Sequence, residues 1–228
     1  MSERLLYVAL DHNEREQNLT LAEQLSEVAG EFGYKVNLDH VILWGLDYVR
    51  DVQSQEKPVF VDLKVNNGPR TMSNIFGNLA EMGVNHTNVW AFADGLIKPA
   101  VKAVEGSETK VLGVTITTRF DDDYCQRHFG RSMRESVRHF AEVAVDNGCN
   151  GIILPGNCLD NVRDISTSKL VPGIRPEGYE RKPDAQKQVV TPHEAVVNGA
   201  DILVCGSPIY KAPNPAESLQ NILSQMRD

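Results

Sequence analysis

The sequence predicts a closed (β/α)8 barrel, and three observations lead to this fold class. Eight short, mostly apolar runs occur along the 228 residues, and amphipathic helical patterns separate them. Such runs between helices are typical of parallel strands that are buried on both faces of a sheet. No long low-complexity linker interrupts the alternation, so we expect one domain over residues 1–228. A doubly wound open sheet is the alternative, because a miscount of one strand would change the assignment.

The expected strands and helices alternate from one end of the chain to the other. In chain order the strands are expected at residues 5–10, 34–38, 58–64, 87–92, 110–116, 151–154, 169–174 and 201–205. The clearest helical patterns are at residues 19–33, 70–83, 131–148 and 215–228. Glycine precedes several strands, at Gly33, Gly83, Gly148 and Gly199. Because glycine favours the left-handed conformation that ends many helices, we expect these four to be C-terminal caps.

Two longer segments interrupt this rhythm. Arg119–Gly130 follows the fifth expected strand, and Pro172–Val190 lies around the end of the seventh. Both lie at the carboxyl ends of strands, which is where barrel enzymes carry their active sites. We therefore expect the functional residues at this end of the barrel.

Composition and charge exclude several classes of protein. The net charge is −8, and no basic run is longer than the pair Arg181–Lys182, whereas nucleic-acid-binding surfaces normally cluster basic residues. No window approaches the ~18 consecutive apolar residues of a membrane span, and the N-terminus does not resemble a signal peptide. The four cysteines lack CxxC spacing, so reduced and mostly buried thiols are expected. We expect a cytoplasmic protein that binds neither nucleic acid nor membrane, and we place no metal site.

Charged residues stand at the carboxyl ends of three strands that would be neighbours in a barrel. Asp62 and Lys64 end the third strand, and side chains two apart in a strand point to the same face. Lys35 lies in the second strand, and Asp11 follows the first. Burying four charged groups is costly unless they pair. We therefore expect these four side chains to converge at the carboxyl-terminal mouth of the barrel.

Two interpretations of this group remain open on the residues alone. The structural interpretation is a salt-bridge network that plugs the barrel. The functional one is a relay for proton transfer. Carboxylates around an ammonium favour its charged form, and a positioned ammonium can protonate a carbon that becomes an anion.

The sequence resembles the orotidine 5'-phosphate decarboxylase family over nearly its whole length. VFVDLKVNNGPRT matches the family signature D-x-K-x-x-D-x-x-x-T at every fixed position but one. VALDHNE resembles the family's first-strand segment, and YKVNLDHVILWGLDYV aligns without a gap on its second strand. PGIRPEG, QKQVVTP and NGADILVCGSPI then follow the family's phosphate-end segments in order. Several matches in the correct order make a far more specific signal than any one of them.

This resemblance implies a decarboxylation that forms uridine 5'-phosphate (UMP) in pyrimidine nucleotide biosynthesis, without a cofactor. Asp11 and Lys35 would lie near the ribose hydroxyls of the nucleotide. Asp62 would sit against the leaving carboxylate, and Lys64 would donate the proton to the pyrimidine carbon. Electrostatic stress on the carboxylate and stabilisation of the carbanion by the lysine would lower the barrier.

The resemblance also implies a homodimer with shared sites and a phosphate-binding end. Thr71 would reach into the site of the neighbouring subunit, because the family's sites lie across a dimer interface. Gln186 and the backbone at Gly206 would hold the phosphate, and Pro172 would shape the same loop.

The sequence departs from the family pattern at three positions that would face the ligand. Asn67 replaces the last aspartate of the signature, which comes from the partner subunit and completes the charge array. Ser207 replaces the arginine that grips the phosphate, and Arg119 stands where the family usually has a serine that reads the pyrimidine. The cations that could replace the lost arginine are Arg119, Arg175, Lys182, Lys187 and Lys211.

Three functions follow from this pattern of matches and departures. The first is a decarboxylase that acts on orotidine 5'-phosphate (OMP). The second is a decarboxylase, lyase or isomerase of the same superfamily with a different nucleotide or sugar phosphate as its substrate. The third is a non-catalytic nucleotide-binding protein, but the intact Asp62 and Lys64 pair argues against it. A dead site would have no reason to retain a costly buried pair.

Overall fold

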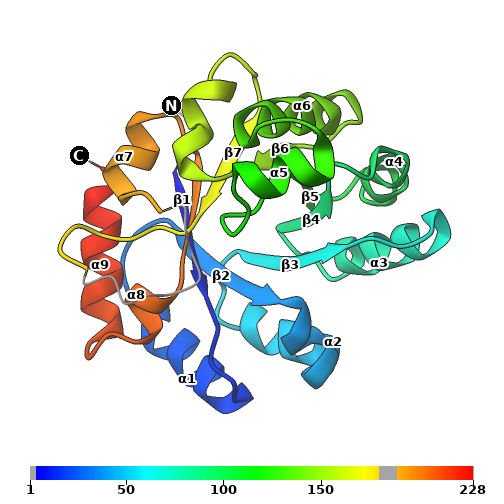
Figure 1. The fold of residues 1–228 in the computed structure, drawn as a ribbon. Coiled ribbons are helices and arrows are strands. Elements are labelled where there is room, and N and C mark those ends of the chain that lie inside the picture. The colour runs from blue at the N-terminus through cyan, green and yellow to red at the C-terminus, as the bar shows by residue number, and fades with distance from the viewer. Residues whose placement is uncertain (1–3, 180–188, 228) are drawn as a thin grey trace.

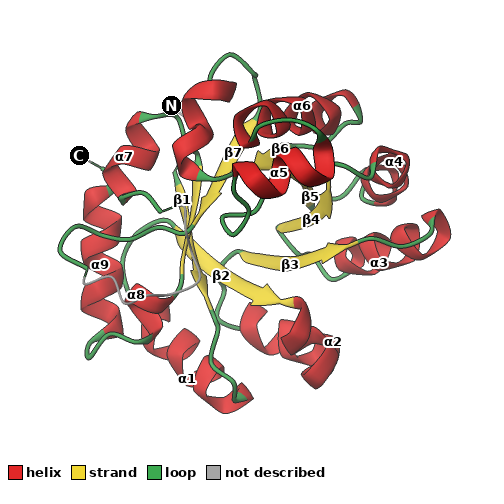
Figure 2. Cartoon of the chain, viewed as in Figure 1, coloured by secondary structure: helices red, strands yellow, loops and turns green. Residues whose placement is uncertain are grey.

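The computed structural model describes residues 4–179 and 189–227, and it confirms the predicted (β/α)8 barrel (Figure 1 and Figure 2). The parallel strands pair in chain order, and β8 pairs with β1 to close the sheet. The strands are β1 (Leu5–Ala9), β2 (Phe32–Asn37), β3 (Val59–Val65), β4 (His86–Trp90), β5 (Lys110–Val114), β6 (Gly151–Ile153), β7 (Ser168–Pro172) and β8 (Ile202–Cys205). Within the described residues, no helix is both long and apolar enough to cross a lipid bilayer.

The helices lie around the outside of the barrel (Figure 2). They are α1 (Arg15–Ser26), α2 (Leu38–Gln53), α3 (Pro69–Glu81), α4 (Asp94–Ala103), α5 (Asp122–Phe129), α6 (Met133–Asp146), the 3-10 helix η1 (Gly156–Val162), α7 (Pro192–Val197), α8 (Ser207–Tyr210) and α9 (Pro215–Gln225). The long segment after β5 therefore contains a helix, α5, whose N-terminus is capped by the Asp121 side chain. The segment after β7 falls only partly within the described residues.

Three of the four predicted glycine caps are confirmed. Gly83, Gly148 and Gly199 have φ values of 72°, 90° and 97°, which is the left-handed region where glycine is favoured. The expectation for Gly33 is wrong, because this residue lies inside β2. A Cβ atom built there would lie 2.1 Å from the carbonyl oxygen of Pro58, so the close approach of β2 to the residue before β3 requires glycine.

The alternation of side chains along each strand produces two apolar layers. Residues such as Leu6 and Val8 of β1 point outward and pack in the large core between the sheet and the helices. Their neighbours point inward and fill the barrel, in a cluster made of Tyr7, Ala9, Phe60, Leu112, Val114, Ile153, Leu170, Ile202 and Val204. At the amino-terminal end of the barrel, the Tyr7 hydroxyl lies 2.7 Å from Nδ1 of His86. The inward positions that follow this cluster along β1, β2 and β3 are polar, and they line a cavity at the carboxyl ends of the strands.

Candidate active site

A cavity of about 550 Å³ opens at the carboxyl ends of the strands. The bottom of the cavity is formed by apolar side chains of the inner cluster, including Ala9, Phe60 and Val204. Of the site residues expected from the sequence, those that line it are Asp11, Lys35, Asp62, Lys64, Arg119, Pro172, Gly206 and Ser207. The size suits a small-molecule ligand, and polar groups meet apolar ones as they do in typical binding pockets.

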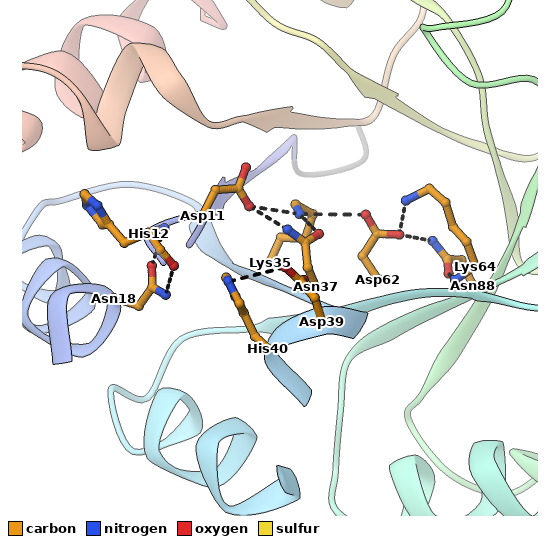
Figure 3. A network of polar contacts seen from close by, with 10 residues as sticks. All are labelled: Asp11, His12, Asn18, Lys35, Asn37, Asp39, His40, Asp62, Lys64 and Asn88. Atoms are coloured by element: carbon orange, nitrogen blue, oxygen red, sulfur yellow. Dashed lines mark hydrogen bonds and ion pairs between the residues drawn. The ribbon is translucent and has the colours of Figure 1, made fainter. Parts of the chain in front are cut away.

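Charges of alternating sign form a row across this cavity (Figure 3). Lys35 Nζ lies 3.5 Å from Asp11 Oδ1 and 3.8 Å from Asp62 Oδ2. Lys64 Nζ in turn donates to Asp62 Oδ1. Asp62 and Lys64 thus point to the same side of the sheet, as the spacing predicts. The order is Asp11, Lys35, Asp62, Lys64, with the carboxylate of Asp62 between two ammonium groups.

The two central side chains of this row are buried, whereas the two at its ends are partly exposed. Lys35 and Asp62 are 8 % and 9 % exposed, whereas Asp11 and Lys64 are 33 % and 34 % exposed. A ligand in the cavity can therefore reach the outer two groups directly. The central pair is buried more deeply but also lines the cavity, and it sets the local field.

Asp62 stays ionised although it is buried. Burial alone would raise the pKa of this carboxyl, but the ammonium groups of Lys64 and Lys35 and hydrogen bonds from Lys64 and Asn88 outweigh it. The net effect is a pKa below the usual range of an aspartate. The site therefore holds a fixed negative charge beside the Lys64 ammonium at neutral pH.

Asn37 connects the first two members of the row. This residue ends β2, two positions after Lys35, so both side chains face the interior of the barrel. Its amide nitrogen donates to Asp11 Oδ1 over 2.7 Å, and its amide oxygen accepts from Lys35 Nζ. The neutral amide of Asn37 thus bridges Asp11 and Lys35, whose direct contact is long at 3.5 Å. It also fixes the Asp11 carboxylate at the edge of the cavity.

Lys64 has an unusual backbone conformation. Its φ is 47°, and among the described residues only Glu56 shares a positive φ without being glycine. Such a conformation costs roughly 1–3 kcal/mol and persists only where surrounding contacts impose it. Strain of this kind clusters at functional sites, so the position of the Lys64 ammonium is maintained at an energetic cost.

The other side of the cavity, at the ends of β7 and β8, carries cations. Arg175 and Lys211 line the cavity there, together with Gly206 and Ser207. The Arg175 guanidinium is buried and donates to the carbonyl of Ile174, whereas Lys211 is exposed. Gly206 leaves room for a ligand next to Asp11, because a Cβ atom there would lie 3.2 Å from Asp11 Oδ2.

Two predicted site residues lie away from the cavity of their own subunit. Asn67 is exposed, with its amide oxygen accepting from the N–H of Gly68, and Thr71 is half-buried in the first turn of α3. Neither lines the cavity. Gln186 lies outside the described residues.

Sequence reasoning missed Asn37, Asn88 and Tyr210, and it also missed Trp90, whose indole Nε1 donates to the backbone carbonyl of Lys64. Asn37 has the same two-residue spacing from Lys35 that links Lys64 to Asp62, which is a usable signal. Asn88 is an amide in the middle of a short buried strand, and such a polar group requires partners. Tyr210 lines the cavity, but it has no such signal in the sequence.

The arrangement of potential metal ligands does not indicate a metal centre in the described part of the chain. Within residues 4–179 and 189–227, no three histidine, cysteine, aspartate or glutamate side chains are grouped so that they could hold a metal ion. The four cysteines are buried and unpaired, and burial raises the pKa of the Cys149 thiol to about 12. The expectation that the reaction needs no cofactor stays a prediction.

Comparisons with known proteins agree with this geometry. Residues 4–222 match the model of the "Orotidine 5'-phosphate decarboxylase / HUMPS family". The orotidine 5'-phosphate decarboxylase of Nautilia profundicola is 31% identical over 98% of this chain and 99% of the relative. That of Nitrobacter winogradskyi is 34% identical over 98% of this chain and 92% of the relative. The crystal structure of the Lactobacillus acidophilus enzyme of the same name superposes with a TM-score of 0.84 at 26% identity, covering 99% of this chain and 100% of that one.

Proposed function

The chain belongs to the orotidine 5'-phosphate decarboxylase / HUMPS family, and we propose that it is a cofactor-free carboxy-lyase that converts OMP to UMP in pyrimidine biosynthesis. The single observation that carries the proposal is the row Asp11, Lys35, Asp62, Lys64 at the mouth of the barrel. Its outer ammonium reaches the cavity, and its buried carboxylate is held ionised beside it. A plug made only of salt bridges would leave no such open cavity above it.

The proposed reaction follows from the charges in this row. The substrate carboxylate binds next to Asp62, where two negative charges repel each other. The bond between the ring carbon and the carboxylate breaks, carbon dioxide leaves, and the electron pair stays on the ring carbon. The Lys64 ammonium stabilises this carbanion and then transfers one proton to it. Water returns a proton to Lys64.

The remaining groups would bind the rest of the nucleotide. Asp11, fixed by Asn37, would accept hydrogen bonds from ribose hydroxyls. The phosphate would lie at the ends of β7 and β8, where Lys211 supplies an exposed positive charge in the absence of the family's arginine at position 207. Phosphate binding energy can lower the barrier when it holds the reacting ring in place.

We also propose that the protein is a homodimer with shared active sites. Asn67 and Thr71 lie outside the cavity of their own subunit, so a role at the ligand requires a second copy. Ile42 and Leu43 of α2, next to α3 in Figure 1, are 73% and 67% exposed. Apolar side chains that are exposed together suit an interface that uses the same patch on both subunits.

Light scattering at micromolar concentration should give twice the monomer mass of 25.3 kDa. Leu43→Glu should shift the protein to the monomer and reduce turnover together, because the partner's residues would leave the site. Val197→Glu is the matched control, since Val197 is 61% exposed but belongs to α7, and this helix lies across the barrel from α2 (Figure 1). A wild-type monomer with full activity would contradict the shared site.

The substrate is tested by restoring the two family residues one at a time. With OMP as substrate, Asn67→Asp should raise kcat, since it adds a negative neighbour for Lys64. Ser207→Arg should mainly lower KM, roughly tenfold or more, because a charge-assisted phosphate contact contributes about 1.5–3 kcal/mol. If the protein instead acts on a different substrate, wild-type turnover of OMP should be negligible, and neither change should create it.

A further inference from the structure

Strand β3 contains extra residues at the point where it carries the catalytic pair. Its register with β4 pairs Phe60 with His86 and Val61 with Thr87, and it resumes only at Val65 with Val89. Residues 62–64 therefore face Asn88 alone. This insertion is a β-bulge, a device that redirects a side chain and must be held by contacts outside the regular ladder.

Asn88 supplies those contacts. Its side-chain oxygen accepts from the backbone N–H of Leu63 over 3.1 Å and from that of Lys64 over 2.8 Å. Its side-chain nitrogen donates to Asp62 Oδ1 over 2.6 Å (Figure 3). Two N–H donors on one side and a carboxylate on the other leave the amide only one orientation.

Asn88 does not act by touching a ligand. The residue is 0% exposed and does not line the cavity. On the same strand, Trp90 donates from its indole Nε1 to the backbone carbonyl of Lys64 over 2.7 Å. Both backbone polar groups of Lys64 are thus bound by side chains of β4, which accounts for its left-handed φ of 47°.

Resting on the proposed function, we propose that Asn88 is a positioning residue for the decarboxylation. One amide binds the backbone of the bulge and the Asp62 carboxylate together, and thereby fixes the distance and direction between Asp62 and Lys64. Regular pairing of β3 with β4 would instead place Leu63 opposite Val89 and shift Lys64 along the strand. The arrangement uses the donor and the acceptor of Asn88 at once, and a side-chain amide carries an acceptor oxygen and an N–H donor side by side.

Two substitutions separate the backbone contacts of Asn88 from its contact with Asp62. Asn88→Ala removes all of these hydrogen bonds. Asn88→Asp keeps an acceptor for the two N–H groups but places a second carboxylate against Asp62. The matched control is Asn85→Ala, because the Asn85 side chain also accepts from a β3 backbone N–H, that of Val59 over 2.8 Å, at the opposite end of the strand. Turnover of OMP and residue-resolved amide hydrogen exchange are measured on all three variants and the wild type.

We expect kcat to fall roughly 100-fold in Asn88→Ala and Asn88→Asp with little change in KM, because misplacing a reacting group impairs the transition state alone. The amides of Leu63 and Lys64 should exchange much faster in Asn88→Ala but stay protected in Asn88→Asp. Asn85→Ala should keep wild-type kcat and affect only the amide of Val59.

Two results would overturn the proposal. One is a kcat for Asn88→Asp equal to that of Asn85→Ala, and the other is unchanged exchange of the Leu63 and Lys64 amides in Asn88→Ala. If the wild type does not convert OMP, the proposed function fails. The exchange measurement then still decides whether Asn88 holds the bulge.

Discussion

Replacing Lys64 with alanine should abolish turnover while leaving the barrel folded. The Lys64 ammonium is the group of the charge row that is both exposed to the cavity and able to donate a proton. General acid catalysis contributes typically 10²–10⁴-fold, and stabilisation of the developing carbanion adds to it. We therefore expect kcat to fall by at least about 10³-fold. Turnover is measured from the rate at which the absorbance of OMP decreases, and this rate should be far lower for the variant than for the wild type.

The control for this variant is Lys57→Ala. Lys57 precedes β3 at the opposite end of the same strand, where its ammonium lies 4.7 Å from the ring centroid of Phe32. It should leave kcat unchanged, and circular dichroism should show both variants folded. If Lys64→Ala retained activity within tenfold of wild type, the chemistry would lie elsewhere, for example on the Arg119–Gly130 segment.

Replacing Asp62 with alanine should reduce both turnover and stability at neutral pH. The side chain is 9% exposed and pairs with two ammonium groups, of which Lys35 is 8% exposed. Removing one partner of a buried ion pair typically costs about 3–5 kcal/mol, because the remaining charge is left without its counterion. Turnover should fall as well, since the repulsion that destabilises the substrate carboxylate is lost.

The stability difference should depend on pH with a defined sign. Asp62 has a lowered pKa in the folded state, so its charge stabilises the fold above its unfolded value of about 3.9. This contribution is lost as the pH falls through the folded pKa. Thermal melts should therefore show a large difference in Tm between wild type and Asp62→Ala at pH 7 that shrinks below about pH 4. An equal Tm for both proteins at pH 7 would show that the charge of Asp62 does not stabilise the fold.

The barrel and the charge row could be predicted because both rest on strong local signals. Apolar runs of strand length alternate with amphipathic helices, and period-two alternation places Asp62 and Lys64 on one face. The prediction for Lys64 assumed a regular strand, however, and the structure reaches the same face through a bulge with a left-handed residue. No property of Lys64 itself predicts its left-handed backbone conformation.

The features that were missed depend on contacts between distant parts of the chain. The spacing of Asn37 from Lys35 and the burial of Asn88 in a strand hint at a role, but their partners Asp11 and Asp62 are identified only when β1 to β4 lie side by side. The sequence pattern predicts a helix cap at Gly33, because the close carbonyl of Pro58 cannot be inferred from the local sequence. The partner-subunit roles proposed for Asn67 and Thr71 rest on the family resemblance, because neither residue lines the cavity of its own subunit.

In the proposed reaction, this site removes carbon dioxide from OMP and protonates the resulting carbanion through Lys64. The most direct test is to incubate the wild-type protein with OMP in deuterium oxide and follow the product by NMR. We expect UMP that carries deuterium at the ring carbon that lost the carboxylate, in amounts equal to the carbon dioxide released. OMP that stays unchanged in the presence of an equal concentration of folded protein would contradict the proposed reaction.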